Sequence, residues 1–354
     1  MSAAPVKIAI IGTGIFAYRH LKAFRAIGDK YQIVACCNRS REKAEKFAKE
    51  AGIPENAVYT DPKQVLQNPD VEAVDVLLPV QYNLEFVKAA IAAGKHIIFE
   101  KPIAHNIQDA QEICKVSQGA KSLVMVAENF AFMNVMNYVA QWVKEGGIGD
   151  VVNFTYSCVR PYSPNSPYYQ TAWRQKPEHP GGYLSDGGVH NLAHIVGVLG
   201  DIQSVTSFAS QTHDIHGAED TLVSAVRMRS GAIGTINFTF YSNQEYQCAA
   251  KAGRVSFEIV GKSGTLRIHD EKKVEYVDAE GVVHPAEEFN AKIQSSPIFS
   301  EFEDVEGEFD HFYKAIRHGE KIVVPPTVAY QHFAFFVSAL ESAKTGKSVD
   351  LPTI

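Results

Sequence analysis

The sequence has few of the features that mark disulfide-bonded, metal-binding or membrane proteins. Its five cysteines are odd in number and include no CxxC pair, which argues against both a disulfide framework and a clustered zinc site. No apolar run approaches the roughly 20 residues that a membrane-spanning helix needs. No basic segment precedes the first apolar run, so a secretory signal is not expected either. We therefore expect a cytoplasmic protein that does not contact membranes.

A surplus of positive charge is also missing. The chain carries 34 Lys and Arg against 40 Asp and Glu, which gives a net charge of −6, so nucleic acid is not an expected partner. What is present is the composition of an ordinary globular protein, with 45 % hydrophobic and 21 % charged residues among 354. A chain of this length usually forms two domains of roughly 100–200 residues each.

The first part of the chain alternates short β-branched runs with helical segments. Strands are predicted over residues 6–11, 31–37, 74–78, 96–99 and 123–127, and helices over residues 15–27, 41–51, 82–93 and 107–118. The strands lack the period-two alternation of half-exposed strands, which indicates a buried parallel sheet. We predict a Rossmann domain with a doubly wound parallel sheet over residues 1–127.

The second part consists of longer, alternating segments joined by short turns. Strands are predicted over residues 151–159, 202–210, 221–228, 232–241, 255–260, 265–269 and 273–277, and helices over residues 186–199, 306–318 and 327–345. Short turns between successive strands require antiparallel pairing. We predict an α+β domain over residues 128–354 with a large open, mainly antiparallel sheet, and its last helix could pack back on the first domain. Apolar residues on more than one face of residues 232–240 favour a homodimer or homotetramer formed through this sheet.

A glycine-rich turn follows the first predicted strand and opens the first helix. It reads Gly12-Thr-Gly14-Ile-Phe-Ala17 and fits the GxGxx(G/A) fingerprint in the structural context that this fingerprint requires. Gly12 would permit the tight turn, and Gly14 would let the backbone approach a pyrophosphate at the helix N-terminus. The alternative is a sharp turn that binds no ligand.

The end of the second predicted strand bears on the choice between NAD and NADP. NAD enzymes usually carry an Asp or Glu about 20 residues beyond the fingerprint, where it binds the ribose 2′-hydroxyl. Here the position holds Asn38, followed by Arg39, Ser40 and Arg41. These side chains can donate hydrogen bonds to a 2′-phosphate that a carboxylate would repel. We predict NADP (NADPH) as the cofactor; the alternative is a solvated arginine and a Ser40 that only caps the next helix.

A lysine lies just beyond the strand predicted over residues 96–99. This is Lys101 of Glu100-Lys101-Pro102, at the edge where ligands bind in open α/β sheets. Pro102 favours an extended Lys101 and would fix the direction of its side chain. The alternative is a solvated surface lysine.

The helix predicted over residues 186–199 carries a second candidate group. Asp186 stands near the predicted N-cap, and His190 follows four residues later on the same face. The positive helix N-terminus disfavours imidazolium and would keep His190 usable as a base. The alternative is a capping aspartate with an unrelated histidine. His190 and His194 also have the spacing of a two-histidine metal site, but no third ligand is evident, so no metal is predicted.

Together these motifs resemble the Gfo/Idh/MocA family of NAD(P)-dependent oxidoreductases. The resemblance covers nearly the whole chain, and it rests on the glycine-rich turn with His20 behind it and on Pro79, Ala-Gly-Lys95, Glu100-Lys101-Pro102, Trp173-Arg174, the run from Gly181 to His190, and Thr345-Gly-Lys347. The segment from Trp173 to His179 is similar to a fungal NADP-dependent branch. Many members have Ser or Thr at the position of Leu78 and His at that of Asn83, so this chain departs from the family at both.

The resemblance implies an enzyme, with Lys101, Asp186 and His190 as its catalytic group. It implies a cofactor site made by Gly12, Gly14, Ile15, Phe16, Asn38, Arg39, Ser40, Arg41, Pro79, Asn83, Glu100, Lys101, Asn129, Trp173 and Arg174. The reaction would be reversible hydride transfer between nicotinamide C4 and a sugar, polyol or related hydroxy or carbonyl compound. His190 would take the hydroxyl proton, Asp186 would orient His190 or the substrate, and Lys101 would hydrogen-bond the reacting oxygen. Two alternatives use the same fold: a non-catalytic NADP-binding regulator and an NAD(P)-dependent glycosidase.

Overall fold

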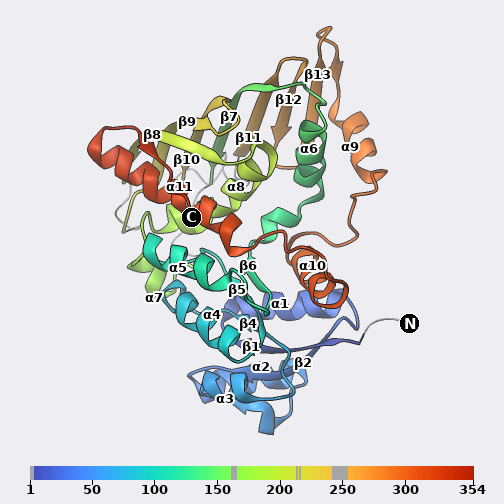
Figure 1. The fold of residues 1–354 in the computed structure, drawn as a ribbon, viewed down its shortest axis with the longest axis vertical. Helices are drawn as coiled ribbons and strands as arrows, with labels where there is room; N and C mark the ends of the chain where they lie inside the picture. The colour runs from blue at the N-terminus through green and yellow to red at the C-terminus, as the bar shows by residue number, and fades with distance from the viewer. Residues whose placement is uncertain (1–3, 161–165, 213, 215–216, 241–253) are drawn as a thin grey trace. The chain divides into compact units, whose positions relative to one another are not determined.

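The computed structural model describes residues 4–160, 166–212, 214, 217–240 and 254–354. The chain divides into two compact units, and each is described by itself (Figure 1). Unit 1 comprises residues 1–132, 301–330 and 354, and unit 2 comprises residues 133–300 and 331–353. This division differs in one respect from the expected boundary between residues 127 and 128, because residues 301–330 return to the first unit.

Unit 1 is built on a six-stranded sheet with the order β3-β2-β1-β4-β5-β6. Every neighbouring pair in this sheet is parallel. The strands are β1 (Val6–Ile11), β2 (Tyr31–Cys37), β3 (Val58–Tyr59), β4 (Ala73–Val76), β5 (His96–Glu100) and β6 (Val124–Ala127). All residues of β4 and β6 are buried, as expected of parallel strands covered on both faces. The prediction of a doubly wound Rossmann sheet is confirmed.

The helices of unit 1 are α1 (Ile15–Ala26), α2 (Arg41–Ala51), α3 (Pro62–Gln67), α4 (Asn83–Ala92), α5 (Ile107–Ser117) and α10 (Asp304–His318), with 3-10 turns η1 (Glu55–Ala57), η2 (Val80–Tyr82) and η3 (Asn129–Phe132). Three of these helices, α2, α3 and α5, begin at side-chain caps. Asn106 caps α5 by accepting a hydrogen bond from the Asp109 backbone N–H at 2.8 Å. Asp61 caps α3 in the same way, with Pro62 at the first helical position.

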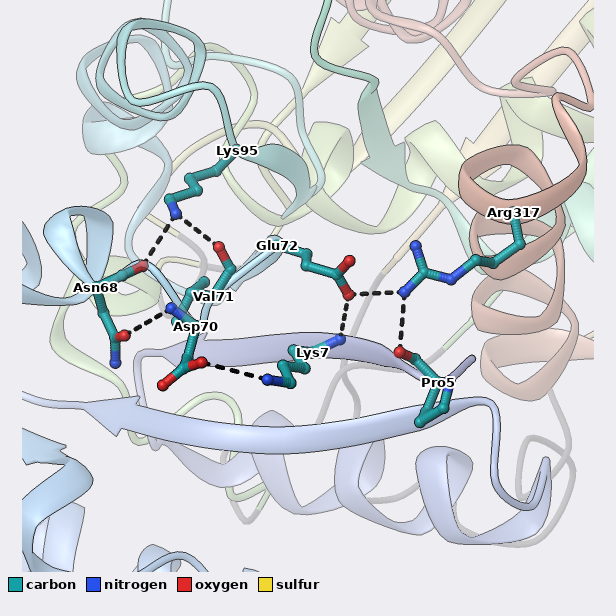
Figure 2. Close-up of polar contacts among 8 residues, drawn as sticks. All are labelled: Pro5, Lys7, Asn68, Asp70, Val71, Glu72, Lys95 and Arg317. Atoms are coloured by element: carbon teal, nitrogen blue, oxygen red, sulfur yellow. Dashed lines mark hydrogen bonds and ion pairs between the residues drawn. The ribbon is translucent and has the colours of Figure 1, made fainter. Parts of the chain in front are cut away.

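Helix α10, from the returning segment, is tied to the first residues of the chain. Figure 2 shows the Arg317 guanidinium between the Glu72 carboxylate, at 2.7 Å, and the Pro5 carbonyl oxygen, at 2.9 Å. Glu72 also accepts a hydrogen bond from the Lys7 backbone N–H at 2.8 Å. Because Glu72 directly precedes β4 and Lys7 lies in β1, this cluster joins α10 to the amino ends of the central strands.

Lys95, part of the Ala-Gly-Lys segment singled out in the sequence, lies at this same edge. Its ammonium group donates to the backbone carbonyl oxygens of Asn68 at 2.9 Å and Val71 at 2.6 Å (Figure 2). Ligands bind at the opposite, carboxyl edge of such sheets. Lys95 therefore holds the loop before β4 and is not a ligand-binding residue.

Unit 2 contains a nine-stranded sheet with the order β14-β13-β12-β11-β7-β10-β9-β8-β15. Its strands are β7 (Val151–Val159), β8 (Ile202–Ser210), β9 (Thr221–Met228), β10 (Ile233–Thr239), β11 (Arg254–Gly261), β12 (Gly264–His269), β13 (Lys273–Asp278), β14 (Val283–His284) and β15 (Val349–Asp350). All pairs are antiparallel except β7 and β10, which are parallel. The mainly antiparallel sheet is confirmed, and Tyr241, at the end of the strand expected over residues 232–241, lies outside the described residues.

Helices cover one face of this sheet (Figure 1). They are α6 (Asn134–Lys144), α8 (Tyr183–Leu199), α9 (Ala286–Gln294) and α11 (Pro326–Thr345), and the short α7 (Ala172–Gln175) precedes α8 in the chain. The core between helices and strands includes Leu192 of α8, Phe336 of α11 and Phe238 of β10. Helix α11 contributes residues up to Tyr330 to unit 1 and the rest to unit 2, so the helix that could pack back on the first domain lies mainly in the second.

The opposite face of the sheet keeps apolar side chains exposed. Phe208 of β8 is 79 % exposed, and Val223 of β9 is its direct cross-strand neighbour. Ile233 of β10 and Val159 of β7 are also exposed, and the pairing register places them on the same face. Exposed apolar side chains therefore lie on the side without helices, at positions that polar residues such as Asn237 separate in the pairing register.

Candidate active site

The two glycines of the turn after β1 differ in whether the structure of the chain requires a glycine there. Gly12 has φ +101°, and a Cβ there would lie 2.3 Å from the Leu77 carbonyl oxygen, so conformation and packing both demand glycine. Gly14 is extended and is the N-cap of α1 without a side-chain cap, and a Cβ on it would meet no atom within 4 Å. Packing within the chain therefore does not explain Gly14. An uncapped N-terminus of a 12-residue helix beside an open glycine suits a pyrophosphate.

The neighbouring residues of the turn are placed consistently with this function. Ile15 is 51 % exposed at the start of α1, and Phe16 is half-buried. Ala17 is fully buried against the sheet, as the third position of the fingerprint requires. The residues present fit a bound dinucleotide.

The end of β2 is held by its own side chains. Asn38 donates through its amide to the Thr13 hydroxyl at 2.9 Å, and its amide oxygen accepts from the Ser40 backbone N–H at 2.9 Å. This fixes a neutral amide next to the glycine-rich turn, because Thr13 belongs to that turn. No carboxylate occupies the position that binds the ribose hydroxyls in NAD enzymes.

The other three candidates at this strand end have separate tasks. Ser40 caps α2, accepting from the Lys43 N–H at 3.4 Å. Arg41 donates to the Val58 carbonyl oxygen at 2.9 Å and pairs with Glu45 at 2.7 Å. Arg39 is exposed, and no other described residue forms a hydrogen bond or ion pair with it. Arg39 is therefore the guanidinium that remains available to a ligand.

Hydrogen bonds from Asn83 fix the backbone of the loop that carries Lys101. The Asn83 amide nitrogen donates to the carbonyl oxygens of Glu100 at 3.1 Å, Pro102 at 3.0 Å and Ile103 at 3.3 Å. Asn83 is 1 % exposed at the start of α4. Its amide nitrogen is thus occupied by backbone carbonyl oxygens, which were not foreseen as its partners. Lys101 itself is half-buried, directly after β5, as predicted.

Two other expected cofactor residues follow β4 and β6, the strands on either side of β5. Pro79 is half-buried between β4 and η2. Asn129 follows β6, and its amide nitrogen donates to the Asp304 carboxylate. Asp304 also pairs with Arg19 of α1 at 3.1 Å. This contact was not predictable from the sequence, because Asp304 comes from the returning segment.

In unit 2, helix α8 starts earlier than expected. Its N-cap is Gly182, with φ +47°, so the prediction that Asp186 stands near the N-cap is wrong by about one turn of helix. The Ser185 hydroxyl reinforces this start by donating to the Pro180 carbonyl oxygen at 2.5 Å. Asp186 lies in the first turn, where a carboxylate still benefits from the helix dipole.

Asp186 has a partner that the sequence did not reveal. Arg174 of α7 donates through Nε to the Asp186 carboxylate at 2.9 Å, and both side chains are largely buried. The expected cofactor residue Arg174 therefore pairs with an expected catalytic residue within unit 2. Trp173 precedes it in α7. His190, half-buried, lies one turn beyond Asp186, as the spacing predicted.

A further acidic residue, Glu271, lies near the face of α8 that carries His190 and His194, here called the histidine face. Its carboxylate is 3.4 Å from His194 Nδ1 and 3.3 Å from Arg160, and it accepts from the Asn191 amide at 3.4 Å. Burial opposes its ionisation, but His194, Arg160 and, more weakly, His190 lower the pKa of Glu271. Asp270 and Glu271 form the β12–β13 turn with positive φ. Sequence reasoning missed this residue because it lies on a turn far along the chain.

Within the described ranges, no group of three or more His, Cys, Asp or Glu side chains is arranged to hold a metal ion. In the same part of the chain, none of the helices combines the length and apolarity that crossing a bilayer requires.

Comparisons with known proteins agree with this architecture. Residues 6–128 match the model of an oxidoreductase family with an NAD-binding Rossmann fold, and residues 140–351 match that of an oxidoreductase family C-terminal alpha/beta domain. The uncharacterized protein YMR315W of Saccharomyces cerevisiae is 36 % identical over 98 % of this chain and 99 % of its own. Levoglucosan dehydrogenase of Pseudarthrobacter phenanthrenivorans is 24 % identical over 99 % of both chains. An oxidoreductase structure from Thermotoga maritima, 28 % identical, superposes over 98 % of both chains with a TM-score of 0.84.

Proposed function

The chain belongs to the Gfo/Idh/MocA oxidoreductase family, and from that premise we propose that it is an NADP-dependent dehydrogenase or reductase acting on a sugar, polyol or related hydroxy or carbonyl compound. Both domain models of the family match, together over nearly the whole chain. A relative aligned along its full length is a levoglucosan dehydrogenase, which supports a carbohydrate-like substrate. The cofactor, when bound, supplies nicotinamide C4 as hydride donor or acceptor.

The observation that carries the cofactor assignment is the end of β2. Asn38 is locked between Thr13 and Ser40, so a neutral amide stands where a carboxylate would repel a 2′-phosphate. Arg39, exposed beside it, can donate two parallel hydrogen bonds to phosphate oxygens. Arg41 adds positive charge while its side chain is held by Val58 and Glu45.

Three residues of this chain would perform the acid–base chemistry. His190 takes the hydroxyl proton in the oxidative direction and returns it in the reductive direction. Lys101 donates a hydrogen bond to the reacting oxygen, on a loop whose carbonyl oxygens are held by Asn83. Asp186, held by Arg174, orients the base or the substrate. Acid–base action of this kind contributes about 10²–10⁴-fold, and positioning supplies much of the rest.

We also propose that the protein is a homodimer or homotetramer in the cytoplasm. Four exposed apolar side chains on the helix-free face of the unit 2 sheet, Phe208, Val223, Ile233 and Val159, support burial of this face in a homodimer or homotetramer. The described cysteines Cys36, Cys37, Cys114 and Cys158 are all free thiols, which supports a reducing compartment such as the cytoplasm.

The test is a substrate screen with the purified protein. A panel of sugars, polyols and diketones is offered with NADPH, NADP, NADH or NAD, and the absorbance of the reduced nicotinamide is followed. We expect turnover that is faster with the phosphorylated cofactor. Tight NADPH binding without turnover of any compound would favour a regulator, and release of a leaving group without net cofactor change would favour a glycosidase.

A further inference from the structure

His20 is a buried histidine of unit 1 that the proposed reaction does not use. It lies on α1, six residues beyond Gly14, and is 0 % exposed. Its Nδ1 is 2.8 Å from the Asp75 carboxylate of β4, and its Nε2 is 3.2 Å from the Glu100 carboxylate at the end of β5. One imidazole thus joins the first helix to two strands of the sheet.

The ring is also fixed by its aromatic neighbours. Phe16 and Phe309 each make an edge contact with it, with ring centroids 4.9 Å away in both cases. Phe16 belongs to the glycine-rich turn, and Phe309 belongs to α10 of the returning segment. The imidazole therefore has little freedom to rotate away from its two carboxylates.

The carboxylates around His20 favour its protonated form. Burial alone would lower its pKa, but the carboxylates of Asp75 and Glu100 raise the pKa of His20 to about 10. Glu308 of α10 is 1 % exposed and near the same group. Burial raises the pKa of Glu308 well above its usual range against the pull of His20, and Glu100, Glu128 and Asp75 raise it further. The two carboxylates therefore favour the imidazolium form of His20, and burial favours the protonated form of Glu308.

This network ends next to the residue to which the proposed function gives a catalytic task. Glu100 directly precedes Lys101, and the Asn83 amide holds the backbone carbonyl oxygens on both sides of that lysine. The backbone of the loop is thus fixed by Asn83. The Glu100 side chain, at the end of β5, faces His20, with its carboxylate 3.2 Å from Nε2.

We propose that His20 is a positioning residue for Lys101: its imidazolium, anchored on Asp75, holds the Glu100 carboxylate and through it the loop that presents the lysine. The proposal rests on the proposed function, in which Lys101 contacts the reacting oxygen. Helix α1 then has two roles, one at the cofactor turn and one at the lysine loop. The same helix that begins at the cofactor turn fixes the loop of the catalytic lysine two turns later.

A double-mutant cycle tests this proposal. His20→Gln removes the cation, Glu100→Gln removes the carboxylate that His20 holds, and the third variant carries both changes. Each single change should lower kcat about 10–100-fold, because misplacement of a reacting group by about 1 Å has effects of that size. The double variant should be no slower than the slower single variant, because both remove one link. The NADPH affinity of His20→Gln should stay within about twofold of wild type, since the cofactor turn is intact.

His96→Gln provides the matched control. His96 stands at the other end of the same strand, and its Nδ1 accepts from the Leu123 backbone N–H at 2.9 Å. Its loss can lower stability but should not lower kcat. Multiplicative losses in the double variant, or an equal loss of kcat in His96→Gln, would overturn the proposal.

A second measurement needs no substrate. Acylation of lysines by a small anhydride is followed by mass spectrometry in the intact protein, with the exposed Lys115 as internal standard. The labelling rate of Lys101 should change in His20→Gln and not in His96→Gln, and an unchanged Lys101 rate would contradict positioning. If Lys101 labelling changes while wild type converts no compound in the screen, the positioning role stands and the proposed function fails.

Discussion

At the scale of single residues, cofactor choice depends on Arg39. We expect Arg39→Ala to weaken NADPH binding at least about tenfold, because a charge-assisted hydrogen bond contributes about 1.5–3 kcal/mol. NADH binding should change little, since NADH has no 2′-phosphate. Titration by nicotinamide fluorescence measures both constants. Arg25→Ala, which removes an exposed arginine bonded to the Glu50 carbonyl oxygen, is the control, and an equal loss for NADPH and NADH would contradict the NADP assignment.

His190 is the residue whose removal should separate chemistry from binding. We expect His190→Ala to lower kcat by about 10²–10⁴-fold, the usual contribution of a general base. The dissociation constant of NADPH should be almost unchanged, because the dinucleotide turn belongs to unit 1. His284→Ala, which removes a histidine paired with Asp278 at 3.0 Å in unit 2, controls for general damage. Near-wild-type turnover by a folded His190→Ala would move the base elsewhere.

Glu308 should make stability depend on pH. Burial raises its native pKa well above the usual range, so the native state binds the proton more tightly than the unfolded chain does. Stability is then present below the unfolded pKa of about 4.3 and is lost as the pH rises toward the native pKa. Glu308→Gln cannot ionise, so its free energy of unfolding relative to wild type should rise between pH 5 and pH 8. Urea unfolding at several pH values measures this difference, and a flat difference would contradict a protonated Glu308.

The candidate site was predictable where its residues follow directly from local geometry. Gly12, Gly14 and Lys101 lie at ends of strands that a sequence pattern can locate, and His190 lies one helical turn from Asp186. The partners of these residues were not predictable. Arg174 reaches Asp186 from a four-residue helix, and Glu271 reaches the α8 histidine face from a distant turn. Such pairs depend on packing that leaves no periodic signal in the chain.

At the scale of elements, α10 depends on one arginine for its attachment to the amino ends of β1 and β4. Arg317→Ala removes the contacts with Glu72 and Pro5 (Figure 2) and leaves Glu72 with the Lys7 N–H alone. We expect a loss of about 1–2 kcal/mol in the free energy of unfolding, since these are charge-assisted and partly buried hydrogen bonds. Lys314→Ala on the same helix breaks a more exposed pair with Asp310 and should cost less, about 0.5 kcal/mol. Equal losses in urea unfolding would show that the Arg317 cluster does not anchor the helix.

Element boundaries were predictable where caps and turns announce them. Helix α2 begins after Ser40 and ends before Gly52 with φ +74°, a signal that can be read directly. Helix α6, which was not predicted, begins after Met133 without a side-chain cap. Helix α8 begins earlier than predicted because Gly182 adopts a conformation that other residues avoid. The prediction instead placed Asp186 near the N-cap.

At the scale of the whole molecule, the exposed apolar side chains on the helix-free face of unit 2 predict self-association. We expect light scattering to give the mass of a dimer or tetramer at micromolar concentration. Phe208→Glu should shift the mass toward the monomer and leave the thermal midpoint of the subunit nearly unchanged, because Phe208 is 79 % exposed within one chain. Val323→Glu, at an exposed valine of unit 1, is the control. A monomeric wild type would contradict the assembly.

The two-domain organisation was predictable from the change of pattern near the middle of the chain, but the path of the chain was not. The segment over residues 301–330 is amphipathic like any other helical stretch, and nothing in its order along the sequence shows that it belongs to unit 1. Its attachment is visible only in contacts such as Phe309 with Phe24, whose ring centroids are 4.2 Å apart.

This path has a consequence for how the protein is made. Most of unit 2 is inserted into unit 1, so a ribosome translates residues 133–300 before the segment that completes the first core. Until α10 emerges, Phe24 and Tyr31 lack the Phe309 ring that covers them, and His20 lacks one of its two aromatic clamps. The core of the nascent Rossmann domain therefore stays incompletely covered while the nine-stranded sheet is being synthesised. A chaperone that binds exposed aromatic surface would find its target in the earliest part of the chain.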